Sequence, residues 1–183
     1  MRYERIVEDG IRFDASVGRV YRLRRISAFS SGSGLSDTES DIVTAWQASY
    51  DPYVTLRHRM RFTEDATITR NEFFGAFKID PVELDVNYAF FESDPSIGAN
   101  LDREEVTGEV SIAIDRNWSV SSFVQRDLQL GEFIRVGGAI AYQNECCKVE
   151  VFLRRRFTDS NDAPASTSVG VQINLLTLGD PDR

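Results

Sequence analysis

The chain has few of the residues from which catalytic and metal sites are commonly built. Its 183 residues include one histidine, His58, and two cysteines, Cys146 and Cys147, which are adjacent. These three residues do not have the spacing of a zinc site, and two cysteines are too few for a disulfide framework. The sequence also has no G-x-S-x-G, phosphate-loop or dinucleotide-binding motif. We therefore expect no enzyme activity, no metal site and no cofactor.

Basic charge and long apolar runs are scarce as well. The chain has 21 Lys and Arg against 29 Asp and Glu, a net charge of −8 at pH 7. A nucleic-acid binder needs a basic stripe to neutralise phosphates, so we expect no nucleic-acid partner. No stretch approaches 18 consecutive apolar residues, and residues 1–5 (MRYER) do not form the apolar core of a signal peptide. A transmembrane helix is excluded, but a membrane barrel is not, because its strands give only segments of about ten alternating residues.

What the chain has instead is a regular alternation of apolar and polar residues. In 82–90, for example, apolar side chains occupy every second position, and Glu83, Asp85 and Asn87 lie between them. A period of two indicates a β-strand with one apolar face. We expect an all-β, antiparallel fold with about eleven strands and no helix. The last three strands are predicted at 133–142, 147–157 and 168–178.

The connections between the expected strands alternate in length. Tight turns are predicted on one side, at residues 9–10, 51–52, 80–81, 116–117 and 144–145. All the long loops, 27–40, 93–102 and 158–167, fall on the other side. This asymmetry, with aromatic residues near the strand ends, is typical of an outer-membrane barrel that has short periplasmic turns and longer outer loops.

Alternation alone leaves two other folds open. One is a soluble, lipocalin-like barrel that binds an apolar ligand and turns its apolar face inward. The other is a small independent outer-membrane barrel of the porin or adhesin kind. The loop asymmetry and the arginine-rich strands favour the membrane.

The polar side of the expected strands carries full charges. In a membrane barrel these residues line the lumen: Arg57, Arg59, Arg61, Glu83, Asp85, Glu150, Arg154 and Arg156. They would contact a partner in the lumen, or form cross-strand ion pairs worth about 0.2–1 kcal/mol each. Glu83 and Asp85 are spaced like a carboxylate pair, but a wet strand face explains them better than acid–base catalysis. His58 falls on the apolar phase and is interpreted as an interfacial residue, whereas Arg70 and Arg155 suggest a rim or a bulge.

Three segments carry a resemblance to a known family. Residues 142–151 (YQNECCKVEV), 154–158 (RRRFT) and 170–179 (GVQINLLTLG) resemble the C-terminus of the LPS-assembly protein LptD family. Residues 18–22 (GRVYR) and the strand succession also resemble that family's barrel, although only the cysteine segment is specific. The resemblance implies an outer-membrane translocon of about 26 strands. An LptE-like plug lipoprotein fills its barrel, and an N-terminal jelly-roll receives lipopolysaccharide from a periplasmic bridge.

The resemblance also implies roles for particular residues. Residues 1–183 would be the C-terminal segment of the barrel, without the jelly-roll, the signal peptide and the first strands. An odd count of eleven strands agrees, since complete bacterial barrels have an even number. Cys146 and Cys147 would form disulfides with two upstream cysteines in an oxidising compartment, the alternative being unpaired structural thiols. The last strand would form one side of a lateral gate toward outer-membrane lipid: Val169, Val171, Ile173 and Leu175. The expected location is the outer membrane, with a periplasmic C-terminus.

Overall fold

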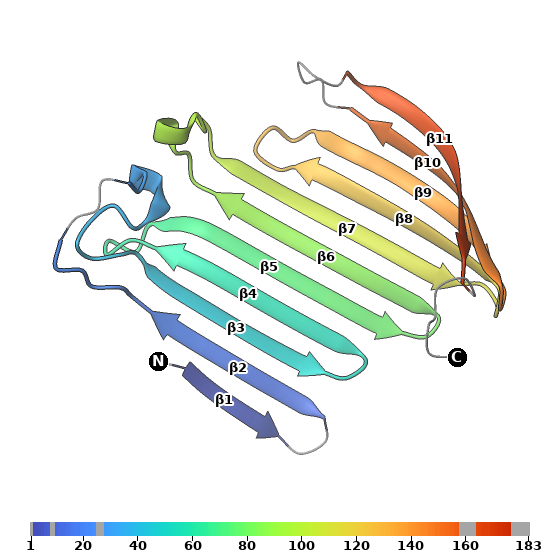
Figure 1. Ribbon diagram of the computed structural model, residues 1–183, viewed down its shortest axis with the longest axis horizontal. Coiled ribbons are helices and arrows are strands. Elements are labelled where there is room, and N and C mark those ends of the chain that lie inside the picture. Colours follow the sequence, from blue (N-terminus) through green and yellow to red (C-terminus); the bar gives the residue numbers. More distant parts are fainter. Residues whose placement is uncertain (1, 8–9, 25–27, 158–163, 177–183) are drawn as a thin grey trace.

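The computed structural model describes residues 2–7, 10–24, 28–157 and 164–176. Eleven strands form a single antiparallel sheet in which each strand pairs with its neighbours along the chain (Figure 1). The strands are β1 (Arg2–Val7), β2 (Ile11–Gly18), β3 (Ile42–Tyr50), β4 (Val54–Phe62), β5 (Ile68–Ile79), β6 (Val82–Phe91), β7 (Arg103–Ala113), β8 (Trp118–Asp127), β9 (Phe133–Gln143), β10 (Cys147–Arg156) and β11 (Ser166–Leu175). The predicted all-β, antiparallel fold with eleven strands is therefore confirmed. The described residues include no helix long and apolar enough to cross a membrane.

The predicted boundaries were less accurate than the predicted order. The second strand, β2, ends at Gly18, and Tyr21 beyond it forms only an isolated bridge with Glu39. The last strand was expected at 168–178, whereas β11 is Ser166–Leu175, and residues 177–178 lie outside the described part. Two one-turn 3-10 helices, η1 (Ser31–Ser33) and η2 (Pro95–Ile97), occupy the two loops in which no regular structure was predicted.

Short and long connections lie at opposite ends of the strands. One end, which we call the turn end, carries the short connections 51–53, 80–81, 114–117 and 144–146. The other end, the loop end, carries the long connections 19–41 and 92–102, together with the shorter 63–67 and 128–132. Most of the third predicted long loop, 158–163, lies outside the described residues. Within the described residues, the predicted asymmetry of the connections is confirmed.

The strand register divides the side chains between two faces. Directly opposed residues of an antiparallel pair point to the same face, so rows of partners can be followed across the sheet. One row runs from Trp46 through His58, Phe73 and Tyr88 to Val106; it lies on what we call the apolar face. The neighbouring row lies on the opposite side, the polar face, and comprises Gln47, Arg57, Phe74, Asn87, Thr107, Gln125 and Arg135.

The sheet is a single layer with almost no core of its own. Within residues 10–24, 28–157 and 164–176, Ala141 is the only hydrophobic residue that is buried, whereas Ile140 and Leu153 on the apolar face are 53% and 52% exposed. Soluble domains bury the apolar side of a sheet against a second layer. The sheet is also open, because β1 and β11 form its two edges and do not pair with each other (Figure 1). Closure into a barrel therefore remains a prediction.

Two glycines on the polar face make room for aromatic rings of the neighbouring strand. Gly137 lies opposite Phe123, and Gly170 lies opposite Phe152. A Cβ atom at Gly137 would lie 2.5 Å from Phe123 Cε1 and 2.7 Å from the carbonyl oxygen of Leu153. A ring can turn away from such a contact, but a backbone carbonyl in a paired strand cannot. Gly137 is therefore required for the close packing of β8, β9 and β10.

We expect Gly137→Ala to lower the free energy of unfolding by about 1–3 kcal/mol, the range for overpacking at a tight site. The measurement is the denaturant midpoint in detergent micelles, followed by tryptophan fluorescence. Gly108→Ala in β7 is the matched control, because the nearest atom to its new Cβ is Val124 Cγ1 at an ordinary 3.7 Å. Alanine there should leave stability unchanged or raise it slightly. Equal midpoints for the two variants would contradict the packing role of Gly137.

Candidate functional site: the polar face and its loop-capped pocket

The charged residues predicted to line a lumen all lie on the polar face. They come from three strands: Arg57, Arg59 and Arg61 from β4, Glu83 and Asp85 from β6, and Glu150, Arg154 and Arg156 from β10. The structure brings them to one face but not to one site. Glu83 forms an ion pair with Lys78 at 2.5 Å near the turn end, and Glu150 lies 3.6 Å from Lys148. Because Glu83 is paired with a lysine, it does not form the carboxylate pair of an acid–base site with Asp85.

Aromatic rings on the polar face were not predicted from the sequence. Arg57 stacks over Phe74 with 4.2 Å between Cζ and the ring centroid, and Arg154 stacks over Phe152 at 4.4 Å. The adjacent residues Phe73 and Phe74 could have indicated an aromatic ring on the polar face. Adjacent residues of a strand point to opposite faces, so one ring of the pair must lie among the charges.

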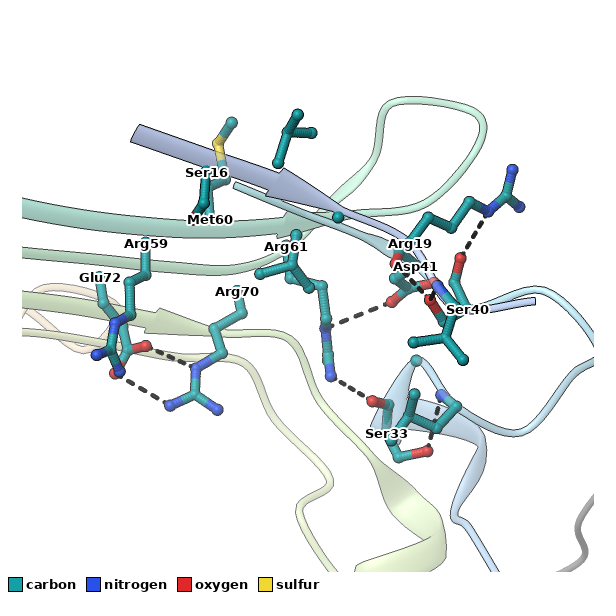
Figure 2. Close-up of a pocket in the computed structure, with 16 residues that line it drawn as sticks. Ser16, Arg19, Ser33, Ser40, Asp41, Arg59, Met60, Arg61, Arg70 and Glu72 are labelled. Atoms are coloured by element: carbon teal, nitrogen blue, oxygen red, sulfur yellow. Dashed lines mark hydrogen bonds and ion pairs between the residues drawn. The ribbon is translucent and has the colours of Figure 1, made fainter. Parts of the chain in front are cut away.

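A pocket of about 750 Å³ opens on the polar face at the loop end (Figure 2). Its floor is formed by β2 to β5, and its roof by the connection between β2 and β3. Six charged residues line it: Arg19, Arg59, Arg61, Arg70, Asp41 and Glu72. Met60 also borders the pocket, but its side chain points away from the arginines (Figure 2). The pocket is therefore rich in guanidinium groups, which bind phosphate and carboxylate groups well.

Arg61 fastens the roof of this pocket to the sheet. Its Nη1 and Nη2 donate to the carbonyl oxygens of Ser33 and Gly32 at 2.6 and 2.7 Å, and its Nε donates to Thr69 Oγ1 at 2.8 Å. Asp41 Oδ2 lies 3.4 Å from the same Nε. With its side chain only 21% exposed and each of its three nitrogens bonded within the protein, Arg61 holds the loop in place. Its contact with a partner in the lumen stays a prediction.

The second long loop supports the first. Asp94, 7% exposed, accepts hydrogen bonds from the backbone N–H and the hydroxyl of Ser96 at the start of η2. A Cβ atom at Gly32 would lie 2.5 Å from Asp94 Oδ2, so the two loops are in direct contact there. Hydrogen bonds from Ser96, Ser30 and the backbone of Gly32 lower the pKa of Asp94. Asp94 therefore stays ionised at neutral pH and links the loops 19–41 and 92–102.

Arg19 forms the third fixed point at the mouth of the pocket. It is bonded to Glu64, its Nη2 lies 2.8 Å from Glu39 Oε2, and its Nε donates to the carbonyl of Ser40 at 2.9 Å. The hydrogen bond and charge of Glu64 raise the pKa of Arg19, and Arg19 in turn lowers the pKa of Glu64. With two carboxylates around it, Arg19 adds no net positive charge to the pocket.

Arg70 and Arg59 face the interior of the pocket. Arg70 donates from Nε and Nη2 to the two carboxylate oxygens of Glu72 at 2.9 and 3.0 Å, and its guanidinium stacks over Phe91 at 4.9 Å. It lies beside a register shift between Arg61 and Phe62, as the predicted bulge requires. Arg59 is exposed and forms no hydrogen bond or ion pair with any residue that the structure describes.

The apolar face carries aromatic pairs at both of its ends. At the turn end, ring centroids lie 5.4 Å apart in the pair Tyr50–Tyr53 and 5.1 Å apart in Trp118–Tyr142. At the loop end, Phe133 and Phe157 lie 6.2 Å apart, with Arg126 and Arg155 stacked over their rings. Arg155 therefore lies at the rim of the apolar face, one of the two places predicted for it.

His58 lies in the middle of β4 on the apolar face. Its Nε2 is 2.8 Å from Asn71 Oδ1, and its ring lies 5.7 Å from that of Trp46. A residue at a membrane interface lies near a strand end, so this central position differs from the interfacial one that the sequence suggested. Asn71 of β5 was not identified from the sequence as the hydrogen-bond partner of His58, because a polar residue is not expected at an apolar position of that strand.

The two cysteines lie at the turn end. Cys146 is exposed in the turn, Cys147 is the half-exposed first residue of β10, and both are free thiols. Their backbone N–H groups donate to Asn144 Oδ1 at 2.9 and 2.8 Å, which defines the turn. On the neighbouring edge strand β11, the four predicted gate residues lie on the apolar face. Val169, Val171, Ile173 and Leu175 are 57–72% exposed.

No group of three or more potential metal-ligating side chains is found among the residues that the structure describes. No protein-family model and no curated protein matches the chain.

Proposed function

We propose that this chain forms part of the wall of an outer-membrane β-barrel, with its apolar face toward lipid and its polar face toward a water-filled lumen. The observation that carries the proposal is the single-layer sheet, with charges on one face and exposed apolar side chains on the other. In water, so large an exposed apolar face would be unfavourable and prone to association. In a bilayer, lipid covers this face and the strand ladders pair the backbone polar groups.

The dimensions of the sheet support this placement. The strands β3 to β11 are 9–12 residues long. A strand of ten residues extends about 33 Å, and a tilt of about 40° reduces its height to about 25 Å, the height of the apolar band of outer-membrane barrels. The aromatic pairs at the turn end and the loop end match the two aromatic girdles of such barrels.

The side on which the long loops fold also supports a polar lumen. Residues 32–35 of the connection between β2 and β3 pack over the polar face, where Arg61 binds the carbonyl groups of Gly32 and Ser33. In a soluble barrel that binds an apolar ligand, the interior is the apolar face, so an inward-folded loop would cover that side. The observed contacts place the loop on the opposite side.

Within this architecture, we assign the chain to lipopolysaccharide transport into the outer leaflet. The segments 142–151 and 170–179 resemble the C-terminus of the LPS-assembly family, and the free cysteines at the turn end are accessible to partner thiols in the periplasm. The polar face would carry the saccharide head group and contact an LptE-like plug lipoprotein. The edge strand β11 would form one side of the gate toward lipid. A periplasmic bridge would supply the lipid.

Site-specific photo-crosslinking tests this function. A photoreactive residue at Asp85, exposed on the polar face, should crosslink to lipopolysaccharide in growing cells. The same residue at the adjacent Leu84, on the apolar face, is the matched control and should not react with the saccharide. If crosslinks to lipopolysaccharide are missing at Asp85, transport along the polar face is wrong. A monomer that folds in water without detergent would contradict the membrane placement itself.

A further inference from the structure

We propose that the loop-capped pocket binds the phosphate group of a phosphorylated saccharide, with Arg59 and Arg70 as its ligands. The inference rests on the proposed function. It adds to that function a chemical group of the ligand and the place on the polar face where this group binds. It is carried by the charges, the hydrogen bonds and the volume of the pocket (Figure 2).

The register concentrates positive charge on adjacent strands. Arg61 of β4 lies directly opposite Arg70 of β5, and Arg59 follows Arg61 on the same face two residues away. Like charges placed directly opposite each other destabilise a strand pair. Two carboxylates offset this pair, since Asp41 lies beside Arg61 and Glu72 binds Arg70. Glu72 also lies directly opposite Arg59 in the register, but no carboxylate of the described residues forms an ion pair with Arg59. The guanidinium of Arg59 is therefore available to bond to an anionic group in the pocket.

Arg59 and Arg70 form fewer polar contacts with the described residues than the other two arginines of the pocket. Arg61 uses Nε, Nη1 and Nη2 on Thr69, Ser33 and Gly32, and Arg19 is surrounded by Glu39 and Glu64. Arg70 is oriented by Glu72 and by the ring of Phe91, but neither contact uses its Nη1. The guanidinium of Arg59 is wholly available. Guanidinium forks bind phosphate oxygens in a bidentate manner, so this pair suits one phosphate group.

The size and lining of the pocket indicate what the phosphate is attached to. A volume of about 750 Å³ lies in the range of small-molecule sites, about 300–1,000 Å³, and far exceeds that of a phosphate ion. Around the arginines, the lining combines the serines Ser16, Ser33 and Ser40 with the apolar residues Val20, Leu35 and Val43. A sugar ring presents both hydroxyl groups and apolar C–H surface, so a phosphorylated saccharide fits this mixed lining.

The test measures binding of glucose 1-phosphate to the full chain in detergent micelles by isothermal titration calorimetry. We expect Arg59→Gln to weaken binding at least tenfold and Arg59→Lys to weaken it less. Arg57→Gln is the matched control, because Arg57 has the same charge, strand and face but stacks on Phe74 outside the pocket. It should bind as the unmodified chain does. Tryptophan fluorescence checks that each variant is folded.

Three results would overturn the site. They are no binding by the folded chain, equal weakening by Arg57→Gln and Arg59→Gln, or equal affinity for glucose and glucose 1-phosphate. A second arm distinguishes free from lipid-linked phosphate, using micelles that contain a phosphorylated glycolipid. Arg59-dependent binding of the glycolipid supports both the site and the transport function. Arg59-dependent binding of glucose 1-phosphate without any binding of the glycolipid would keep the site and contradict the transport of lipopolysaccharide.

Discussion

Replacing Val151 by arginine is expected to destabilise the membrane-inserted sheet by about 2–4 kcal/mol, the cost of a basic side chain at the bilayer midplane on the lipid face of a barrel. Val151 is the fifth of the ten residues of β10, and its cross-strand partners are Ile140 and Val171. All three side chains are on the apolar face and about half exposed or more. This position is as far from both ends of the strand as β10 allows, so an arginine there has the longest path to water.

The same substitution has a different outcome if the sheet works in water. Val151 is 49% exposed, and a surface substitution away from special features changes stability by no more than about 0.5 kcal/mol. Guanidinium unfolding of the protein in lipid vesicles measures the difference. The matched control is Gln172→Arg on the polar face of β11, where the new charge faces Glu150. We expect the control to stay within about 0.5 kcal/mol of the original chain. Equal stabilities of the two arginine variants would reject the lipid-facing assignment.

The order of the strands could be predicted from the sequence because it depends on local patterns. Alternation over 82–90 and the turn residues at 51–52 and 80–81 each involve neighbours in the chain, and antiparallel strands joined by tight turns pair with the next strand. The two faces follow from the same period of two. The charged residues predicted on one side, from Arg57 to Arg156, therefore do share a face.

The pocket could not be predicted, since it depends on contacts between residues far apart in the sequence. Arg61 binds the carbonyl groups of residues 28 and 29 positions before it, and Asp94 touches Gly32 across two loops. A Ser- and Gly-rich segment such as 27–40 has no periodicity that would indicate where it packs. Arg70 was ambiguous for a related reason, because the register shift at Arg61/Phe62 changes the phase of β5 without any mark in the sequence.

The roof of the pocket is expected to depend on one side chain. Arg61→Ala removes two hydrogen bonds to the loop, at Ser33 and Gly32, and a third to Thr69 of β5, and it leaves Asp41, 20% exposed, without its ion-pair partner. Hydrogen bonds from charged groups contribute about 1.5–3 kcal/mol, and they are not additive. We therefore expect the loop 28–41 to lose about 2–4 kcal/mol of docking free energy. Hydrogen exchange of this segment measures the change, because its amides include Asp41 N–H, which donates to the carbonyl of Gly34.

Arg70→Ala is the control for this experiment, because it removes an arginine directly opposite Arg61 on the same face. Its ion pair with Glu72 has side chains 45% and 31% exposed, and such exposed pairs contribute about 0–1 kcal/mol. Exchange of 28–41 should therefore accelerate at least tenfold in Arg61→Ala and little in Arg70→Ala. Equal rates would mean that the loop is held by Asp94 and Arg19 instead. The expected difference would identify Arg61 as the residue that holds the roof over the pocket. This role is separate from the ligand binding proposed for Arg59 and Arg70.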